Sequence, residues 1–153
     1  MSKLRLALYA VFTLVSLVII VDFVSPGRRN TADIIKVERE LQSHYNASQN
    51  YHYSYRLITK EHGFQVSEEF SKLAREGARV EYSVSRIFTE INWYRLLPSG
   101  DKSFYSMRIG LGLALPLLAL MSIFLSYRLK TKNDIPVVIL QILLIGDLIF
   151  LVM

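Results

Sequence analysis

The chain contains no cysteine among its 153 residues. This absence excludes disulfide bonds, cysteine-ligated zinc and thiol nucleophiles. A G-x-S-x-G turn, a phosphate-binding glycine loop and a zinc motif are also missing. The histidines, His44, His52 and His62, lie eight and ten positions apart, whereas metal ligands usually follow shorter, fixed spacings. The sequence therefore predicts no catalytic, cofactor-binding or metal-binding residue, and it disfavours an enzyme.

A continuous stripe of one charge sign is missing as well. The formal net charge is +5, but residues 25–107 carry twelve Lys/Arg interleaved with ten Asp/Glu. Proteins that bind nucleic acid usually gather their positive charges on one face. We therefore expect no nucleic-acid partner, and we assign the positive charges beside the apolar runs to contacts with lipid headgroups.

Apolar residues, in contrast, are abundant, and they gather in three runs: Leu4–Val24, Ile109–Tyr127 and Ile135–Met153. Each run is long enough to cross the hydrocarbon core of a bilayer as a helix. We predict a membrane protein with transmembrane helices at residues 1–25, 107–128 and 135–153, an extramembrane module at residues 26–106 and a cytoplasmic loop at residues 129–134.

The first apolar run is also compatible with a cleavable signal peptide, because it is short and follows Lys3 and Arg5. A pair of small residues in the A-x-A arrangement is missing around residues 22–26. The sequence therefore favours an uncleaved signal anchor. Asp22 is then expected at the exit of this helix, where its carboxylate reaches water.

The module between the first two runs has the pattern of a β-rich fold. Residues 51–59 alternate with a period of two, and residues 64–66 form a partner strand after a turn. Further strands are predicted at residues 80–84 and 87–97. Residues 31–41 fit a helix or a strand, and their β-branched side chains favour a strand.

Ser67 is expected to cap one short helix that ends at Gly77. This order of elements indicates a small OB-like barrel, with an SH3-like barrel as the alternative. We predict that its core receives inward-facing side chains from Tyr53, Tyr55, Val66, Phe70, Leu73, Val80, Tyr82 and Val84.

The layout also resembles small bacterial membrane proteins of unknown function, of the DUF3592-like kind. The similarity lies in a first span, then Tyr53-Ser-Tyr55, Phe64-Gln-Val66-Ser and Gly77-Ala-Arg-Val80-Glu-Tyr82, and then further spans. This resemblance implies a similar fold and no activity.

One acid lies deep in an apolar run. A charge near the bilayer centre is costly, so we expect Asp147 to be protonated or paired inside a helix bundle. Ser16 and Pro116 fall at a similar depth, and Pro116 frees the carbonyl of Gly112, so Ser16 and Gly112 are the predicted partners. No basic side chain is expected there. The alternative is an Asp147 that snorkels to the surface.

Two further groups of residues are predicted to make contacts in or at the membrane. Gly110 and Ala114 form a small-xxx-small pair that would allow close packing of helices. Trp93 and Tyr94 belong to an aromatic-rich set that suits the membrane interface. Stacking of these aromatic side chains on single-stranded nucleic acid or sugar is the alternative.

The distribution of positive charge favours a cytoplasmic N-terminus, with the module and the C-terminus outside the inner membrane. Lys3, Arg5, Arg128, Lys130 and Lys132 would lie inside, against Arg28, Arg29, Lys102 and Arg108 outside.

These features predict a non-catalytic accessory or scaffold subunit that contacts the lipid bilayer and other membrane protein subunits. The alternative is an envelope module that senses a small ligand or stress.

Overall fold

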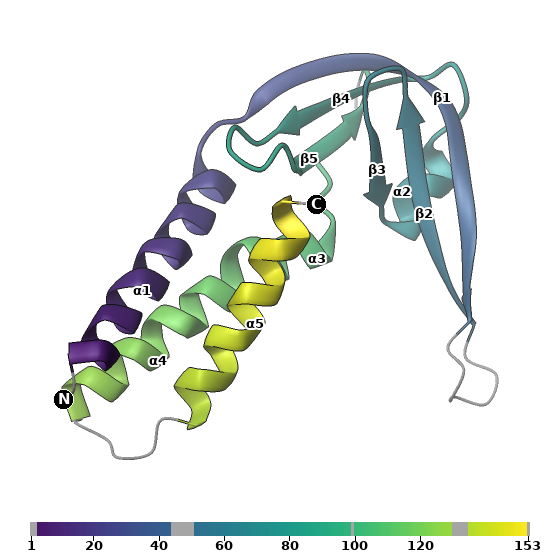
Figure 1. The fold of residues 1–153 in the computed structure, drawn as a ribbon. Coiled ribbons are helices and arrows are strands. Elements are labelled where there is room, and N and C mark those ends of the chain that lie inside the picture. The colour runs from purple at the N-terminus through teal and green to yellow at the C-terminus, as the bar shows by residue number, and fades with distance from the viewer. Residues whose placement is uncertain (1–2, 44–50, 99, 130–134, 153) are drawn as a thin grey trace. The chain divides into compact units, whose positions relative to one another are not determined.

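The computed structural model describes residues 3–43, 51–98, 100–129 and 135–152. Figure 1 traces the chain from α1 through five strands to the last helix, α5. The chain divides into a helical unit (Met1–Pro26, Ser85–Glu90 and Met107–Met153) and a sheet unit (Gly27–Val84 and Ile91–Ser106). His44 and most of the predicted loop, residues 130–134, lie outside the described residues.

Three helices of the helical unit are long and apolar enough to cross a membrane, as predicted. They are α1 (Lys3–Val24), the continuous helix formed by α3 (Ser106–Ile109), η1 (Gly110–Ala114) and α4 (Leu115–Leu129), and α5 (Ile135–Val152). Helix α4 packs against both α1 and α5, which Figure 1 shows on either side of it.

The helices turn their polar side chains inward and their large apolar side chains outward. The buried positions of α4 are Pro116, Ala119, Ile123 and Ser126, and this spacing of three or four residues lies on one helix face. The buried polar side chains of the spans are Ser16, Asp22, Arg108, Ser126, Gln141 and Asp147. An apolar exterior around a polar interior is what a bilayer favours, so the three spans fit a multi-pass membrane protein.

The sheet unit is built on one long central strand, β1 (Arg28–Ser43). The antiparallel sheet has the order β3–β2–β1–β4–β5, with β2 (Tyr51–Thr59), β3 (Gly63–Val66), β4 (Arg79–Val84) and β5 (Ile91–Leu96). Residues 28–33 of β1 pair with β4, whereas residues 34–43 pair with β2. The register shifts between Ile34 and Lys36, and such a bulge bends a strand. The sheet therefore curls into a half-barrel, with β3 and β5 as its two edges.

The predicted strands at residues 31–41 and 51–59, the turn after them and the partner strand are confirmed. The strand predicted at residues 87–97 begins only at Ile91, because residues 85–90 belong to the helical unit. The predicted barrel is thus a half-barrel of five strands with one short helix, α2 (Glu68–Leu73), between β3 and β4.

The N-terminus of α2 is as predicted, and its C-terminus is not. The Ser67 hydroxyl accepts a hydrogen bond from the Phe70 N–H at 3.3 Å. The helix ends at Leu73, since Ala74 already has extended backbone angles. Gly77, with φ +82°, instead forms the turn that brings its N–H to the carbonyl of Ile34 at 2.8 Å. The positive φ explains the glycine in this turn.

The core of the sheet unit contains most of the predicted inward residues. Val66, Phe70, Val80, Tyr82 and Val84 are buried, and Tyr55 packs against them. The core also includes five residues absent from the prediction: Ile34, Leu57, Phe64, Ala74 and Tyr94.

Tyr53 and Leu73 were predicted inside and are exposed. Strand β3 pairs with β2 only as far as Tyr55, so Tyr53 lies beyond the covered part of the sheet. Phe70 in α2 and Ala74, the residue that follows α2, are buried in the core, and Leu73 between them faces away from it.

Candidate functional site

A buried ion pair joins the end of α1 to the start of the second span. Asp22 Oδ2 accepts a hydrogen bond from Arg108 Nη2 at 3.1 Å, and Asp22 Oδ1 accepts one from the Ile87 N–H at 2.8 Å. The side chains of Asp22 and Arg108 are 0% and 5% exposed. The prediction that Asp22 reaches water at the helix exit is therefore wrong, and so is the assignment of Arg108 to lipid headgroups.

The loop between β4 and β5, residues 85–90, closes over this pair. Its ends are joined by two hydrogen bonds, from the Ser85 N–H to the Glu90 carbonyl at 2.7 Å and from the Glu90 N–H to Ser85 Oγ at 3.1 Å. Phe88 packs against the apolar cluster of Ile19, Ala119, Leu144 and Leu151. One short loop thus contacts Asp22 of α1 and the apolar cluster that α1, α4 and α5 form together.

Glu90 brings a second carboxylate close to the pair. Burial raises the pKa of Glu90 above its ordinary value of 4.5, the positive charge of Arg108 opposes this increase, and the charge of Asp22 adds to it. The folded helical unit therefore holds this proton more tightly than the unfolded chain does. The contribution of Glu90 to stability decreases as the pH rises from about 4.5 to the higher folded-state pKa.

Asp147, the predicted intramembrane residue, faces the interior of its own bundle. It is 4% exposed, so it does not snorkel to the surface, and neither carboxyl oxygen has a hydrogen-bond partner. Ser16 Oγ is also buried without a partner, so the predicted hydrogen bonds from Ser16 to Asp147 and from Asp147 to the Gly112 carbonyl are not formed. The positive charge of Arg108 acts on Asp147.

We expect Asp147→Leu to leave the thermal stability of the protein in mild detergent unchanged or to increase it. A buried carboxyl without a hydrogen bond costs about 1–3 kcal/mol, and an apolar side chain of similar size removes that cost. Asp147→Asn is the matched control, because its amide keeps the unsatisfied polar group. A marked loss of stability in Asp147→Leu alone would show instead that Asp147 helps to hold Arg108.

The close contact between helices lies at Gly112, two residues from the predicted pair. A Cβ placed on Gly112 would lie 2.7 Å from Phe23 Cδ2 and 3.3 Å from Arg108 Nη1. Nothing lies within 4 Å of a Cβ on Gly110, and Ala114 is exposed, so the predicted contact through Gly110 and Ala114 is wrong.

The π-helical turn η1 contributes to this shift. It ends at Ala114, two residues before the buried Pro116, and the Leu115 N–H bonds to the Gly110 carbonyl across it. A π-turn moves the following residues around the helix axis, so a face counted at α-helical spacing is displaced.

Gly112→Ala is expected to destabilise the protein by about 1–3 kcal/mol, because the new methyl group forces η1 away from Phe23. The neighbouring change Gly110→Ala should be neutral or slightly stabilising, since alanine favours a helix more than glycine does. Thermal denaturation of both variants in the same detergent measures the difference. Equal effects at the two positions would contradict the assigned contact.

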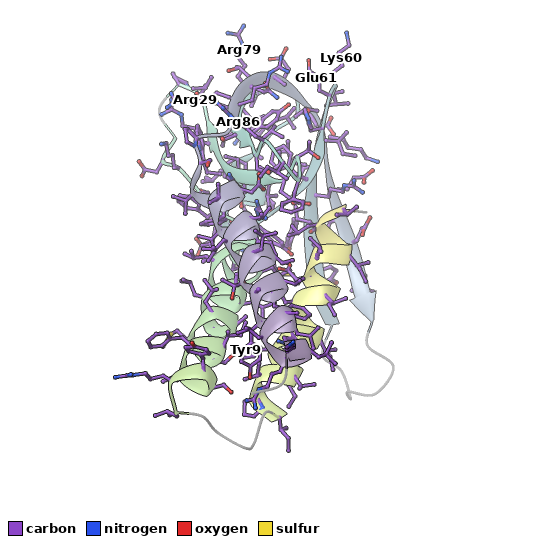
Figure 2. The ribbon with its side chains drawn as sticks, turned by 60° about the vertical axis from the view of Figure 1, so that its left-hand side comes forward. Tyr9, Arg29, Lys60, Glu61, Arg79 and Arg86 are labelled. Atoms are coloured by element: carbon purple, nitrogen blue, oxygen red, sulfur yellow. The ribbon has the colours of Figure 1, made fainter. Side chains whose placement is uncertain are left out.

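A second polar cluster joins α1 to α4 at the opposite ends of these helices. Arg5 Nη2 donates to Ser126 Oγ at 2.9 Å, Arg5 Nε donates to the Tyr9 hydroxyl at 3.0 Å, and Tyr9 Oη lies 2.9 Å from Ser126 Oγ. Figure 2 shows Tyr9 between the helices. The sequence pattern missed this cluster, because its members are up to 121 positions apart.

The two predicted interface aromatics have different surroundings. Tyr94 is 1% exposed in the core of the sheet unit, and its hydroxyl accepts a hydrogen bond from the Ser67 N–H at 2.9 Å. Burial raises its pKa, so the hydroxyl stays protonated. The prediction that Tyr94 rests at the membrane interface is therefore wrong. Trp93 points to the other face of β5, where it is partly exposed.

The two edges of the half-barrel also differ. At β5, Tyr94 and Ser103 exchange backbone hydrogen bonds of 3.0 and 2.8 Å, which cover part of that edge. In an antiparallel pair, successive residues direct their backbone N–H and C=O groups alternately toward and away from the neighbouring strand. His62 bonds to Thr59, so at β3 the backbone groups of Gly63 and Gln65 point away from β2. The edge at β3 is therefore the more open of the two.

His62 lies in the turn before β3, and its Nδ1 is 3.0 Å from the Tyr82 hydroxyl, whereas His52 lies in β2. Within residues 3–43, 51–98, 100–129 and 135–152, no three His, Cys, Asp or Glu side chains form a group that could hold a metal ion. Comparison of the chain with protein-family models, curated proteins and solved structures gave no match.

Proposed function

We propose that this protein is a non-catalytic accessory or scaffold subunit of a larger membrane assembly. The observation that carries the proposal is the open edge of the half-barrel at β3, which is less covered than the edge at β5. An unpaired sheet edge is a template for a strand from another chain. The partner is therefore another membrane protein whose extended segment pairs with Gly63–Val66.

The experiment is stoichiometric co-purification in mild detergent. Gln65→Pro removes a backbone N–H that points away from β2, whereas the control Gln65→Ala keeps it. The wild type and Gln65→Ala should retain the partner in a fixed ratio, and Gln65→Pro should lose it. A wild-type protein that purifies without a partner in a fixed ratio would overturn the proposal.

The second candidate is an envelope-sensing module that signals through its helices, and the loop of residues 85–90 favours it. This loop is continuous with β4 and β5, yet it packs on Asp22 and on the apolar cluster of the helical unit. A change in the loop would therefore act directly on the α1–α4 contact.

The sensing function predicts that the thiol of Arg86→Cys in the loop changes its accessibility with ligand or pH. The matched control is Arg79→Cys in β4, and both positions carry exposed side chains (Figure 2). Equal and constant labelling of the two thiols would argue against the sensing function. A partner in a fixed ratio would favour the scaffold.

The proposed threading has a cytoplasmic N-terminus, with the sheet unit and the C-terminus outside the inner membrane. Arg108 is neutralised by Asp22, which leaves three outer positive charges against five inner ones and supports the positive-inside assignment.

Lys60→Cys should react with a membrane-impermeant thiol reagent in intact cells, and Arg128→Cys only after lysis. The cysteine-free wild type gives the background. The reverse labelling pattern would invert the threading.

A further inference from the structure

Trp93 lies beside two positive charges on the outer face of the half-barrel. In the register of the sheet, Arg29 on β1 is opposite Ser83 on β4, and Ser83 is opposite Trp93 on β5. The Arg29 guanidinium carbon is 5.9 Å from the centroid of the indole ring, and Lys102 Nζ is 4.6 Å from it. Both distances are typical of cation–π contacts. Figure 2 labels Arg29, whose side chain is exposed.

The neighbouring cations on this face are already neutralised. Arg79 lies 3.6 Å from Asp33, and Arg95 forms an ion pair with Glu81. No acidic side chain in the described part of the chain forms an ion pair with Arg29 or Lys102. Two cations without an acidic partner in the described part of the chain thus lie beside a partly exposed indole.

The covalent chain keeps this site close to the apolar helices. Arg29 follows Val24, the last residue of α1, by five positions, and Lys102 precedes Ser106, the first residue of the second span, by four. Even a fully extended chain places the Cα atom of each cation within about 17 Å of the Cα atom at the end of a span. Phospholipid headgroups occupy the layer immediately outside the hydrocarbon core.

We propose that Arg29, Trp93 and Lys102 bind the phosphate of anionic phospholipid headgroups at the bilayer surface. The two cations attract the phosphate, and the indole, with an apolar body and a polar N–H, suits the headgroup layer. Arginine supplies directed donors to phosphate oxygens, and lysine supplies a point charge. A lipid bilayer offers this anion at high density within reach of both residues.

The chain provides its own probe, because Trp93 is its one tryptophan. The full-length protein is placed in nanodiscs of mixed phosphatidylglycerol and phosphatidylcholine. In one set the phosphatidylglycerol carries bromine near its headgroup, and in the other set the phosphatidylcholine does. We expect Trp93 fluorescence to be quenched more by brominated phosphatidylglycerol than by the same amount of brominated phosphatidylcholine.

The double variant R29Q/K102Q should lose this preference for phosphatidylglycerol. Each charge removed should lower the relative affinity for the anionic lipid roughly fivefold. The control K60Q/R75Q removes two exposed charges elsewhere on the sheet unit and should keep it. Equal quenching by the two brominated lipids in the wild type would overturn the proposal. So would a preference that K60Q/R75Q reduces as much as R29Q/K102Q does, since bulk charge would then explain it.

A second arm separates a lipid headgroup from a soluble phosphate. Inorganic phosphate is added to the detergent-solubilised protein, and the quenching of Trp93 by aqueous acrylamide is measured. We expect little protection at phosphate concentrations matched to those of the headgroups in the nanodiscs. Strong protection that R29Q/K102Q abolishes would assign the site to a free anion and overturn the lipid assignment.

Discussion

Arg108→Met is expected to destabilise the protein by about 3–5 kcal/mol, because it leaves the Asp22 carboxylate buried without its counter-charge. The pair is almost completely shielded from solvent, so water cannot replace the lost partner. Thermal denaturation in mild detergent, followed by size-exclusion chromatography, measures the loss.

The double variant Asp22→Leu/Arg108→Met tests the cause. With both charges removed, no ion is left buried alone, and the double variant should be more stable than either single variant. Its remaining loss should be close to the value of one hydrogen bond, since the Ile87 N–H no longer has its acceptor. If the double variant lost as much stability as the two single variants together, Asp22 and Arg108 would not be directly coupled.

Tyr94→Ala is expected to cost about 3–5 kcal/mol, the value of a large aromatic side chain removed from a packed core. The ring of Tyr94 lies edge-on to Phe70, with 4.5 Å between centroids, and 5.8 Å from Phe64. Its removal also leaves the Ser67 N–H, at the start of α2, without its acceptor. Circular dichroism during thermal denaturation should show an earlier loss of the β signal.

Trp93→Ala is the matched control for this substitution. The two aromatic residues are adjacent in β5 but point to opposite faces of the sheet. Trp93→Ala should therefore change the stability of the sheet unit much less. If the two variants were equally mild, Tyr94 would not be a core residue, and its original assignment to the membrane interface would be restored.

The elements were largely predictable from local patterns. In a bilayer, the three apolar runs are stable as membrane-spanning helices. The alternation of side chains at Tyr51–Thr59 is typical of a half-buried strand. Ser67 was found because a cap depends on residues three positions apart. The end of α2 was missed, since Gly77 has a positive φ for a turn toward Ile34, which is distant in the sequence.

The contacts of the candidate site could not be predicted in the same way. Asp22 and Arg108 are 86 positions apart, and each occupies the end of an apolar run, where an exposed charge is the ordinary expectation. The loop of residues 85–90 resembled part of a strand, because the side chains of Ile87 and Phe88 suit either environment. Only the packing of α1, α4 and α5 gives the Phe88 side chain a place in the helical unit.

The sequence by itself determined that the chain has three membrane-spanning helices around a β-rich module, because hydrophobic length and side-chain alternation are local properties. The tertiary structure alone decided which polar residues are paired. In the folded protein Asp22 is buried with Arg108, and Asp147 has no hydrogen bond. The close contact between helices lies at Gly112, and Tyr94 is buried in the core whereas Trp93 is partly exposed. These outcomes depend on which helix faces meet and on how a bulge bends β1, and contacts between distant segments determine both.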